Sequence, residues 1–443
     1  MQNQGIRDAR SLGTPKLLVL GLQHMFAMFG ATVLVPALTG LSVSATLLFA
    51  GLGTLFFHFL TKGKVPAFLG SSFAYLAGYA AIAPNGETAL LPYACVGVAA
   101  SGLLYLILSA LVRGFGANRV MRFFPPVVTG PIIICIGMTL ANSAINNCTG
   151  SWDIALVAIL TVVIFNIWGK GMLRIIPILL GVLVSYVYAA ITGRVDFSGV
   201  ASAAWIGLPV KMENTAFSLI GNCDANLLVT AIIAIMPIAF ATMIEHIGDI
   251  CAISSTVGAN FIADPGLHRT LLGDGLATSI ASLFGAPANT TYGENTGVLA
   301  LTRVYDPLVI RLAAVYAIIA SFCPKFAALV SAMPTGTIGG VSLILYGMIS
   351  AIGVRNLVEN RVDLAKSRNV IVVSLIISLA LGITFSTAGA ITFHVGEFTL
   401  NFSGLAVAAI VGIVVNAILP GKDYNFQNDY EYGKTTEDHG QML

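Results

Sequence analysis

The sequence predicts an all-α polytopic membrane protein with fourteen transmembrane segments arranged as a 7+7 inverted repeat. Composition and the spacing of apolar runs are the first two observations behind this prediction. Hydrophobic residues make up 57% of the 443 residues and charged residues only 9%, whereas an ordinary soluble domain carries about 25% charged residues. Runs of about 20 apolar residues, the length that crosses the hydrocarbon core as a helix, recur between short polar joints. A soluble protein is excluded, because too few polar groups remain to cover its surface.

The apolar runs define the expected spans. Their approximate ranges are 17–39, 42–61, 66–83, 91–112, 126–145, 153–169, 175–192, 227–250, 270–285, 288–302, 307–323, 337–354, 369–388 and 403–420. The third and the tenth contain Gly, Ser and Thr, so they are expected to be broken rather than continuous helices. Broken backbone at membrane depth must be paired inside the protein or line a cavity.

The basic residues supply the third observation, because cytoplasmic loops are enriched in Lys and Arg. With the N-terminus inside, only Arg194, Lys211 and Lys325 of the 22 basic residues fall on the outer side. A miscounted span would invert everything after it and destroy this bias. The pattern therefore predicts a cytoplasmic N-terminus (1–16), a cytoplasmic tail (421–443) and one large outer loop (195–226).

Two sets of seven spans must be inverted relative to each other, because seven is odd. Weak echoes between the halves support a repeat: in each half Gly-Leu-x-Thr precedes a proline and then a small polar stretch with an aromatic residue, at 51–54, 66 and 70–75 and again at 275–278, 287 and 289–293. Interrupted segments at matching positions of inverted repeats indicate a substrate site near the bilayer midplane. Residues 71–75 and 290–294 are expected to pair as short strands, with half-helices whose N-termini direct N–H groups at that site.

Ionisable residues inside spans are costly and therefore mark candidate functional positions. Glu245 and Asp249 are four residues apart and share one helix face. Two neighbouring carboxylates repel when both are charged, so one of them is expected to hold a proton, as a proton carrier must. Glu294 lies in the broken tenth segment beside Asn295, and His24 lies in the first segment.

Structural roles compete with functional ones at several of these positions. Asp249 is also suited to capping nearby broken backbone, and His24 to an internal hydrogen bond. Phe73 either packs or stacks on a flat ring. His246 and Asp274 are expected to be structural, the latter because it lies near the start of the ninth segment, where a helix N-terminus stabilises a carboxylate.

Such a site favours a flat neutral molecule with N–H donors and carbonyl acceptors, and a nucleobase meets that description. Amino acids and cations also suit carboxylates and stay open on this reasoning. An anion exchanger or channel is disfavoured, because no Lys or Arg is expected at the midplane. Neither H-E-x-x-H nor G-x-S-x-G occurs in the chain and its six cysteines show no C-x-x-C spacing, so no enzyme, metal or redox site is expected. A net charge of +2 gives no reason to expect nucleic acid.

Several motifs, in order along the chain, resemble the nucleobase–ascorbate transporter family, also called nucleobase–cation symporter 2. They are residues 23–32 in the first segment, 70–74 in the third, 245–248 in the eighth, 264–269 before the ninth, 289–297 in the tenth and 339–343 in the twelfth. Within the family the chain most resembles the bacterial uracil:proton symporters. The resemblance implies import of uracil with protons, driven by the proton gradient without a cofactor, across the bacterial inner membrane.

The resemblance also implies a domain organisation and a set of roles. A core domain would comprise residues 17–112 and 227–323, and a gate domain residues 126–192 and 337–420, with an antiparallel strand pair in segments 3 and 10 and a homodimer formed through the gate domain. Two glutamates would hydrogen-bond the base, a phenylalanine would pack on it and three further residues would shape the pocket: Glu245 and Glu294, then Phe73, then Gly293, Tyr292 and Ala31.

One position departs from the pattern. The uracil symporters carry His four residues after the glutamate of segment 8, where this chain has Asp249, as purine-transporting relatives commonly do. A xanthine or uric acid symporter is therefore the alternative. Our hypothesis for coupling is that Glu245 and Asp249 share the proton, with His24 in support. Asn295 and Ser72 are further supporting candidates.

Overall fold

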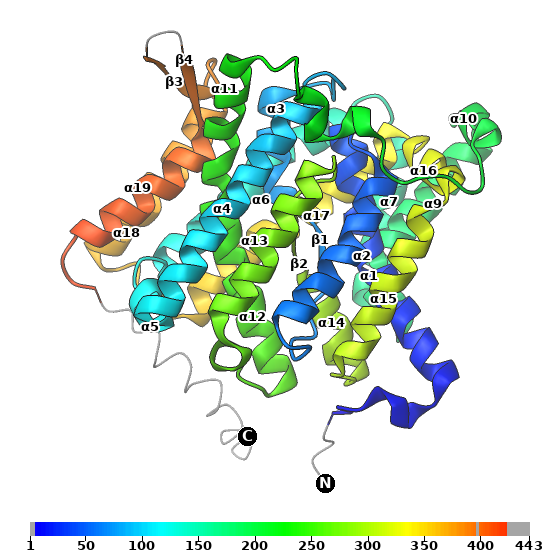
Figure 1. Ribbon diagram of the computed structural model, residues 1–443, viewed down its shortest axis with the longest axis horizontal. Coiled ribbons are helices and arrows are strands. Elements are labelled where there is room, and N and C mark those ends of the chain that lie inside the picture. Colours follow the sequence, from blue (N-terminus) through cyan, green and yellow to red (C-terminus); the bar gives the residue numbers. More distant parts are fainter. Residues whose placement is uncertain (1–4, 396–397, 423–443) are drawn as a thin grey trace.

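The computed structural model describes residues 5–395 and 398–422 of the chain (Figure 1). The described part is predominantly helical, as predicted. Of the expected cytoplasmic tail, only residues 421 and 422 belong to it, and the rest of 421–443 lies outside the described residues.

The first half begins with the 3₁₀ turn η1 (Ala9–Leu12). It continues with α1 (Thr14–Thr39), α2 (Val43–Leu60), β1 (Leu69–Ser71), η2 (Phe73–Tyr75), α3 (Leu76–Ile82), α4 (Leu91–Phe115), α5 (Ala117–Met121), α6 (Pro126–Cys148), α7 (Trp152–Trp168), α8 (Met172–Ile175) and α9 (Pro177–Ile191). A connection with α10 (Ser198–Ser202), η3 (Met212–Asn214) and η4 (Ala216–Leu219) follows. This connection, the expected outer loop, lies at the opposite end of the molecule from η1 (Figure 1).

The second half comprises α11 (Ala225–Ile235), η5 (Met236–Ile238), α12 (Ala239–Val257), η6 (Ile262–Gly266), α13 (Leu267–Leu283), β2 (Asn289–Thr291), α14 (Gly293–Thr302), α15 (Pro307–Ser321), α16 (Pro324–Ser331), α17 (Thr335–Glu359), α18 (Ser367–Thr384), β3 (Ala390–Val395), β4 (Phe398–Ser403) and α19 (Gly404–Ile418). Each expected span except the eighth thus coincides, to within a few residues, with a helix or with a strand followed by a helix; the eighth, 227–250, is occupied by α11, η5 and α12 and continues to Val257. Within the described residues, seven helices are by themselves long and apolar enough to cross a membrane, or eight if the bent pair α15–α16 is one span. The chain is therefore a multi-pass membrane protein, and the count of fourteen stays a prediction.

The helices pack closely through small residues. Where α4 crosses α13, a Cβ on Gly102 would lie 2.4 Å from the carbonyl oxygen of Gly275, so only glycine permits this approach. Helices of the expected core domain pack on one another in this way, as α2 does on α13 and α15, and α6 and α17 pack together in the expected gate domain. The division into a core and a gate domain stays a prediction.

The strands β1 and β2 pair in the interior of the molecule (Figure 1). They are antiparallel, with Leu69 opposite Thr291, Gly70 opposite Thr290 and Ser71 opposite Asn289. Neighbouring hydroxyls satisfy the outer backbone groups, because Thr54 Oγ1 accepts from Leu69 N at 2.9 Å and Thr278 Oγ1 donates to the Asn289 carbonyl at 2.8 Å. The pair ends earlier than expected from the sequence: residues 73–75 form a 3₁₀ turn and α14 begins at Gly293.

A second hairpin, β3–β4, joins α18 to α19 in the segment between the last two expected spans, where the sequence analysis predicts no element. Residues 391–395 and 398–403 alternate large apolar residues with polar ones, which is the signal that could have revealed it.

Candidate functional site

Three carboxylates from two helices meet at the start of α14. Glu245 and Asp249 lie one turn apart on α12, and Glu294 occupies the first turn of α14. All three residues are partly buried, and their charges interact with one another. Within the described residues, Glu245 and Glu294 have no side-chain partner, whereas Asp249 accepts a hydrogen bond from Thr291 Oγ1 at 3.1 Å. Two of the three carboxylates are therefore available to a ligand.

Glycines open the space beside these carboxylates. A Cβ on Gly293 would lie 3.6 Å from Asp249 Oδ1, which places the start of α14 directly against α12. Gly297 is one turn further along α14, and Gly248 precedes Asp249 on α12. A Cβ at Gly297 or at Gly248 would meet no atom within 4 Å. The carboxylates thus border an unfilled space rather than a packed core.

The N-terminus of α14 contributes backbone donors to the same place. Its N-cap residue, Tyr292, is extended and makes no side-chain capping bond, so the first N–H groups of the helix stay unbonded by a cap. The helix dipole adds partial positive charge at this end. Carbonyl oxygens of a ligand are therefore matched here by N–H groups, next to carboxylates that accept.

Phe73 and Ser72 lie on the other strand–helix unit. Phe73 begins η2, is only 8% exposed and contacts the ring of Tyr346 on α17 edge-on, with ring centroids 6.1 Å apart. Ser72 N donates to the Ala288 carbonyl at 3.0 Å, while its buried Oγ has no partner among the described residues. Phe73 thus joins the expected core to the expected gate.

The side chain of Tyr292 packs against β1. Its hydroxyl donates to the Ser71 carbonyl at 2.7 Å, and Ser71 Oγ and Thr32 Oγ1 lie within 3.2 and 3.4 Å of it. Its ring fills the volume beside Gly70, where a Cβ would lie 2.6 Å from ring carbons. The residue is 5% exposed, so little of its side chain is accessible to a ligand.

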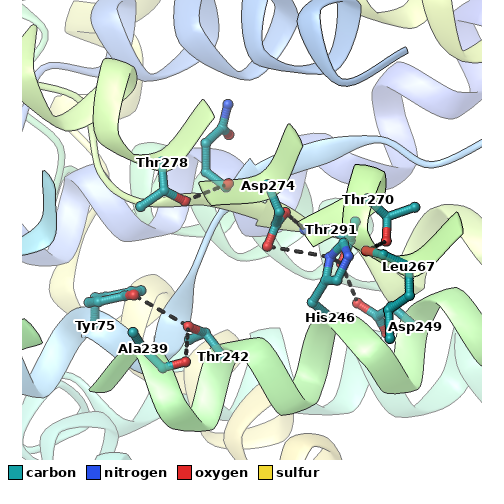
Figure 2. A network of polar contacts seen from close by, with 11 residues as sticks. Tyr75, Ala239, Thr242, His246, Asp249, Leu267, Thr270, Asp274, Thr278 and Thr291 are labelled. Carbon is teal, nitrogen blue, oxygen red and sulfur yellow. Dashed lines mark hydrogen bonds and ion pairs between the residues drawn. The ribbon is translucent and has the colours of Figure 1, made fainter. Parts of the chain in front are cut away.

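A hydrogen-bonded network links Asp249 to residues behind β2 (Figure 2). Thr291 donates from Oγ1 to Asp249 and from its backbone N to Asp274 Oδ1 at 3.1 Å. His246 Nδ1 lies 3.2 Å from Thr291 Oγ1 and 3.4 Å from Asp274 Oδ2, and both His246 and Asp274 are fully buried. Asp274 lies in the middle of α13 rather than near its start, so the N-terminus of its own helix does not stabilise it. The expectation about its surroundings is therefore wrong.

His24 contacts α14 and not the α12 carboxylates. Asn295 Nδ2 lies 3.2 Å from His24 Nδ1 and donates to the His24 carbonyl at 3.1 Å, which ties α1 to the residue next to Glu294. Any effect of His24 on Glu245 or Asp249 therefore passes through α14. Ala31 lies in α1, and its side chain is outside the described part of the structure.

The sequence did not single out Thr291, although it lies within the 289–297 motif and contacts Asp249, His246 and Asp274. A threonine in an interrupted segment, three residues before a glutamate, was the available signal. His246 and Asp274 were considered only for structural roles, and the network places both within two hydrogen bonds of Asp249.

Solved transporter structures share this fold. The transmembrane domain of a cyanobacterium bicarbonate transporter, BicA, aligns with a TM-score of 0.59 over 94% of this chain and 100% of its own, at 13% identity. A structure of SLC26A9 aligns with a TM-score of 0.62 over 92% of this chain and 66% of its own, at 11% identity. At such identities the likeness concerns the fold alone.

Sequence relatives are far more similar. The uracil permease of Bacillus caldolyticus is 42% identical over 96% of each chain. The uracil permease of Bacillus subtilis (strain 168) is 40% identical over 99% of this chain and 98% of its own. These relatives are permeases rather than enzymes, and the model of the Permease family matches residues 15–389. The resemblance identified from the motifs is confirmed, and the chain belongs to the Permease family.

Proposed function

We propose that this protein imports uracil, or a closely related nucleobase, together with protons by alternating access. The observation that carries the proposal is a pair of carboxylates, Glu245 and Glu294, that have no side-chain partner among the described residues and lie beside the N-terminus of α14, whose N-cap side chain makes no capping bond. A pyrimidine ring needs acceptors for its N–H groups and donors for its carbonyls, and this corner supplies both. The permease relatives named for uracil support the same substrate.

Each site residue then has a distinct role. Glu245 and Glu294 accept ring N–H groups, and the backbone at Gly293 and the first turn of α14 donates to a carbonyl. Phe73 covers the ring face, since an aromatic platform suits a flat base. Tyr292, Ser72 and Ala31 shape the surroundings, with Tyr292 acting through the strand pair.

Proton coupling is assigned to the carboxylate cluster. Three carboxylates with mutually interacting charges, without an ion-paired base among the described residues, cannot all be charged at low cost. Asp249 is poised between Glu245 and the network of Thr291, His246 and Asp274. A proton shared by Glu245 and Asp249 would therefore be released or retained according to whether a base occupies Glu245 and Glu294.

Alternating access would move the carboxylate helices relative to α17, which carries Tyr346. The edge-on contact between Phe73 and Tyr346 is one point where the expected core and gate touch near the site. We place the protein in the bacterial inner membrane with both termini cytoplasmic, with fourteen spans and dimerisation through the gate domain, as the family resemblance implies.

Uptake of labelled uracil into proteoliposomes with an imposed inward proton gradient tests the proposal. We expect accumulation above the external concentration, its collapse with a proton uncoupler, and competition by unlabelled uracil. Liposomes carrying Glu294→Gln protein are the matched control for leakage. Uptake that ignores the uncoupler would replace symport with facilitated diffusion.

Asp249 favours one second candidate, a xanthine or uric acid symporter, because purine-transporting relatives commonly carry Asp at this position. A competition panel of free bases in the same assay separates the two. If xanthine competes fully while uracil competes poorly, the substrate assignment changes to a purine and the coupling scheme stays.

A further inference from the structure

A basic pocket lies at the end of α2, away from the carboxylate site. Its volume is about 440 Å³, and its lining combines two cations with apolar side chains: Leu55, His58, Phe59, Lys62, Gly63 and Arg311. α2 is one of the helices long and apolar enough to cross a membrane, and Lys62 follows its last turn. The pocket therefore lies where a span ends and charged residues begin.

The two cations of the pocket lack carboxylate partners in the part of the chain that the structure describes. Arg311 donates only to neutral acceptors, to His58 Nδ1 at 3.4 Å and to the Gly63 carbonyl at 3.3 Å. The backbone N–H of Lys62 donates to the Phe59 carbonyl at 3.2 Å, and its side chain makes no hydrogen bond or ion pair with the described residues. Asp264, the carboxylate whose charge Lys62 influences, is already ion-paired with Lys64, which lowers the pKa of that carboxyl. Two positive charges thus face the pocket uncompensated.

The apolar part of the lining faces outward. Phe59 is 77% exposed, one turn from Leu55 on α2, in a helix with the composition of a membrane span. An aromatic side chain at this depth is matched by an acyl chain or glycerol backbone, whereas a free inorganic anion would gain nothing from it. Basic pockets between helices at the membrane surface bind anionic headgroups.

We propose that this pocket binds the phosphate of an anionic phospholipid, with Lys62 and Arg311 contacting the headgroup and Leu55 and Phe59 the apolar part of the lipid. The charge bias of the sequence predicts that Lys62 and Arg311 both lie on the cytoplasmic side. The bound lipid would therefore belong to the cytoplasmic leaflet.

The pocket also reaches the strand pair. His58 Nε2 donates to the Ala67 carbonyl at 2.9 Å, since a carbonyl only accepts, and its Nδ1 then accepts from Arg311. Ala67 lies two residues before β1. A bound lipid that holds Arg311 would therefore hold His58 and the entry to β1, and should stabilise the protein.

The backbone conformation of Lys62 permits substitutions that remove its charge without straining the fold. Lys62 adopts a left-handed conformation with φ 57°, which glycine adopts without strain. Lys62→Gly removes the charge without opposing the fold, and Lys62→Asn does the same with another residue that tolerates this conformation. Arg303, at φ 55° after the last turn of α14, is the matched control, because Arg303→Gly also removes one cation from a left-handed position, but outside the pocket.

The experiment measures the thermal midpoint of purified protein in detergent against added phosphatidylglycerol, and against phosphatidylcholine with identical acyl chains. We expect phosphatidylglycerol alone to raise the midpoint of the wild type and of Arg303→Gly. Lys62→Gly and Lys62→Asn should require about fivefold more lipid for the same shift, the loss expected for one surface cation. Native mass spectrometry should show fewer retained phosphatidylglycerol molecules on the Lys62 variants.

Three outcomes would overturn the proposal. Lys62 variants that respond like the wild type would show that the headgroup binds elsewhere. Equal shifts with phosphatidylcholine would show that charge is not recognised. The same shift with inorganic phosphate would identify the ligand as a free anion instead of a lipid.

Discussion

The unit β1–η2–α3 and the unit β2–α14 share a backbone plan and differ in chemistry. Both are short buried strands that run into a helix, and they pair antiparallel with each other. The first unit carries no carboxylate and starts its helical part with the buried Phe73, whereas the second starts its helix with the exposed Gly293 and with Glu294. The two units therefore share a backbone arrangement but not a side-chain function. The first contributes the apolar Phe73, and the second contributes the carboxylate of Glu294.

The largest expected effect comes from removing that charge. In Glu294→Gln, one of two acceptor oxygens becomes a donor that faces the ligand's N–H group. A hydrogen bond to a charged group contributes about 1.5–3 kcal/mol, so affinity should fall roughly 10- to 150-fold. Calorimetric titration of the variant and the wild type with uracil measures this change in affinity. Glu359→Gln, which changes an exposed carboxylate ion-paired with Arg355 at 2.6 Å, is the control. Affinity within twofold of wild type would remove Glu294 from the site.

Asp249→Asn should separate coupling from binding. The amide oxygen of Asn can still accept from Thr291 Oγ1, so local structure is kept, but the side chain no longer takes up a proton. We expect uracil exchange across the proteoliposome membrane to survive better than proton-driven accumulation, which should stop at the external concentration. Concentrative uptake close to wild type would end the coupling hypothesis for this residue.

Alanine substitutions at one glycine in each unit, Gly70 and Gly293, allow the packing of the two units to be compared. An Ala Cβ at Gly70 would lie 2.6 Å from the Tyr292 ring and 2.9 Å from Thr32 Oγ1, whereas at Gly293 the nearest atom would be 3.6 Å away. Gly70→Ala should therefore cost about 1–3 kcal/mol of stability. Gly293→Ala should leave the thermal midpoint nearly unchanged and lower the affinity for uracil by narrowing the space beside Asp249. Thermal unfolding and titration of both variants check this, and equal midpoints would mean that the strand pair yields to the added methyl group.

Tyr292→Phe should give the smallest effect. It removes the hydroxyl that donates to the Ser71 carbonyl and so weakens the link between the units by about 1 kcal/mol. The thermal midpoint should fall slightly, and the affinity for uracil should fall less than in Glu294→Gln. Tyr316→Phe is the control, because the exposed Tyr316 hydroxyl also donates to a backbone carbonyl, that of Leu18. If the thermal midpoint of Tyr292→Phe equals that of Tyr316→Phe, the Tyr292 hydroxyl does not contribute to the link between the units.

Much of the fold could be predicted because apolar length and charge bias are read along the chain. The expected span 126–145 corresponds to α6, and the expected span 91–112 corresponds to α4. Such ranges can be predicted because a helix that crosses a membrane must satisfy its backbone hydrogen bonds internally. The β3–β4 hairpin was not predicted, because its alternating residues are few and lie between two strongly apolar helices. The strand pairing of segments 3 and 10 was expected, but its register depends on hydroxyls such as Thr54 Oγ1.

For the site, spacing placed Glu245 and Asp249 on one face, because residues four apart on a helix are neighbours. The proximity of Glu294 to Asp249 had to come from packing, since α12 and α14 are separated by α13 and β2 in the sequence. The same holds for His24, whose bond to Asn295 spans most of the chain.

The sequence by itself determined that this is a multi-pass membrane protein of the Permease family, because composition, apolar length and motif order are one-dimensional properties. Only the tertiary structure decided which polar groups are satisfied and which are free. It gave Asp249 a partner in Thr291, left Glu245 and Glu294 without a side-chain partner in the described part of the chain, and brought Lys62 to Arg311. Those outcomes depend on the close packing of helices distant in sequence, which no local pattern encodes.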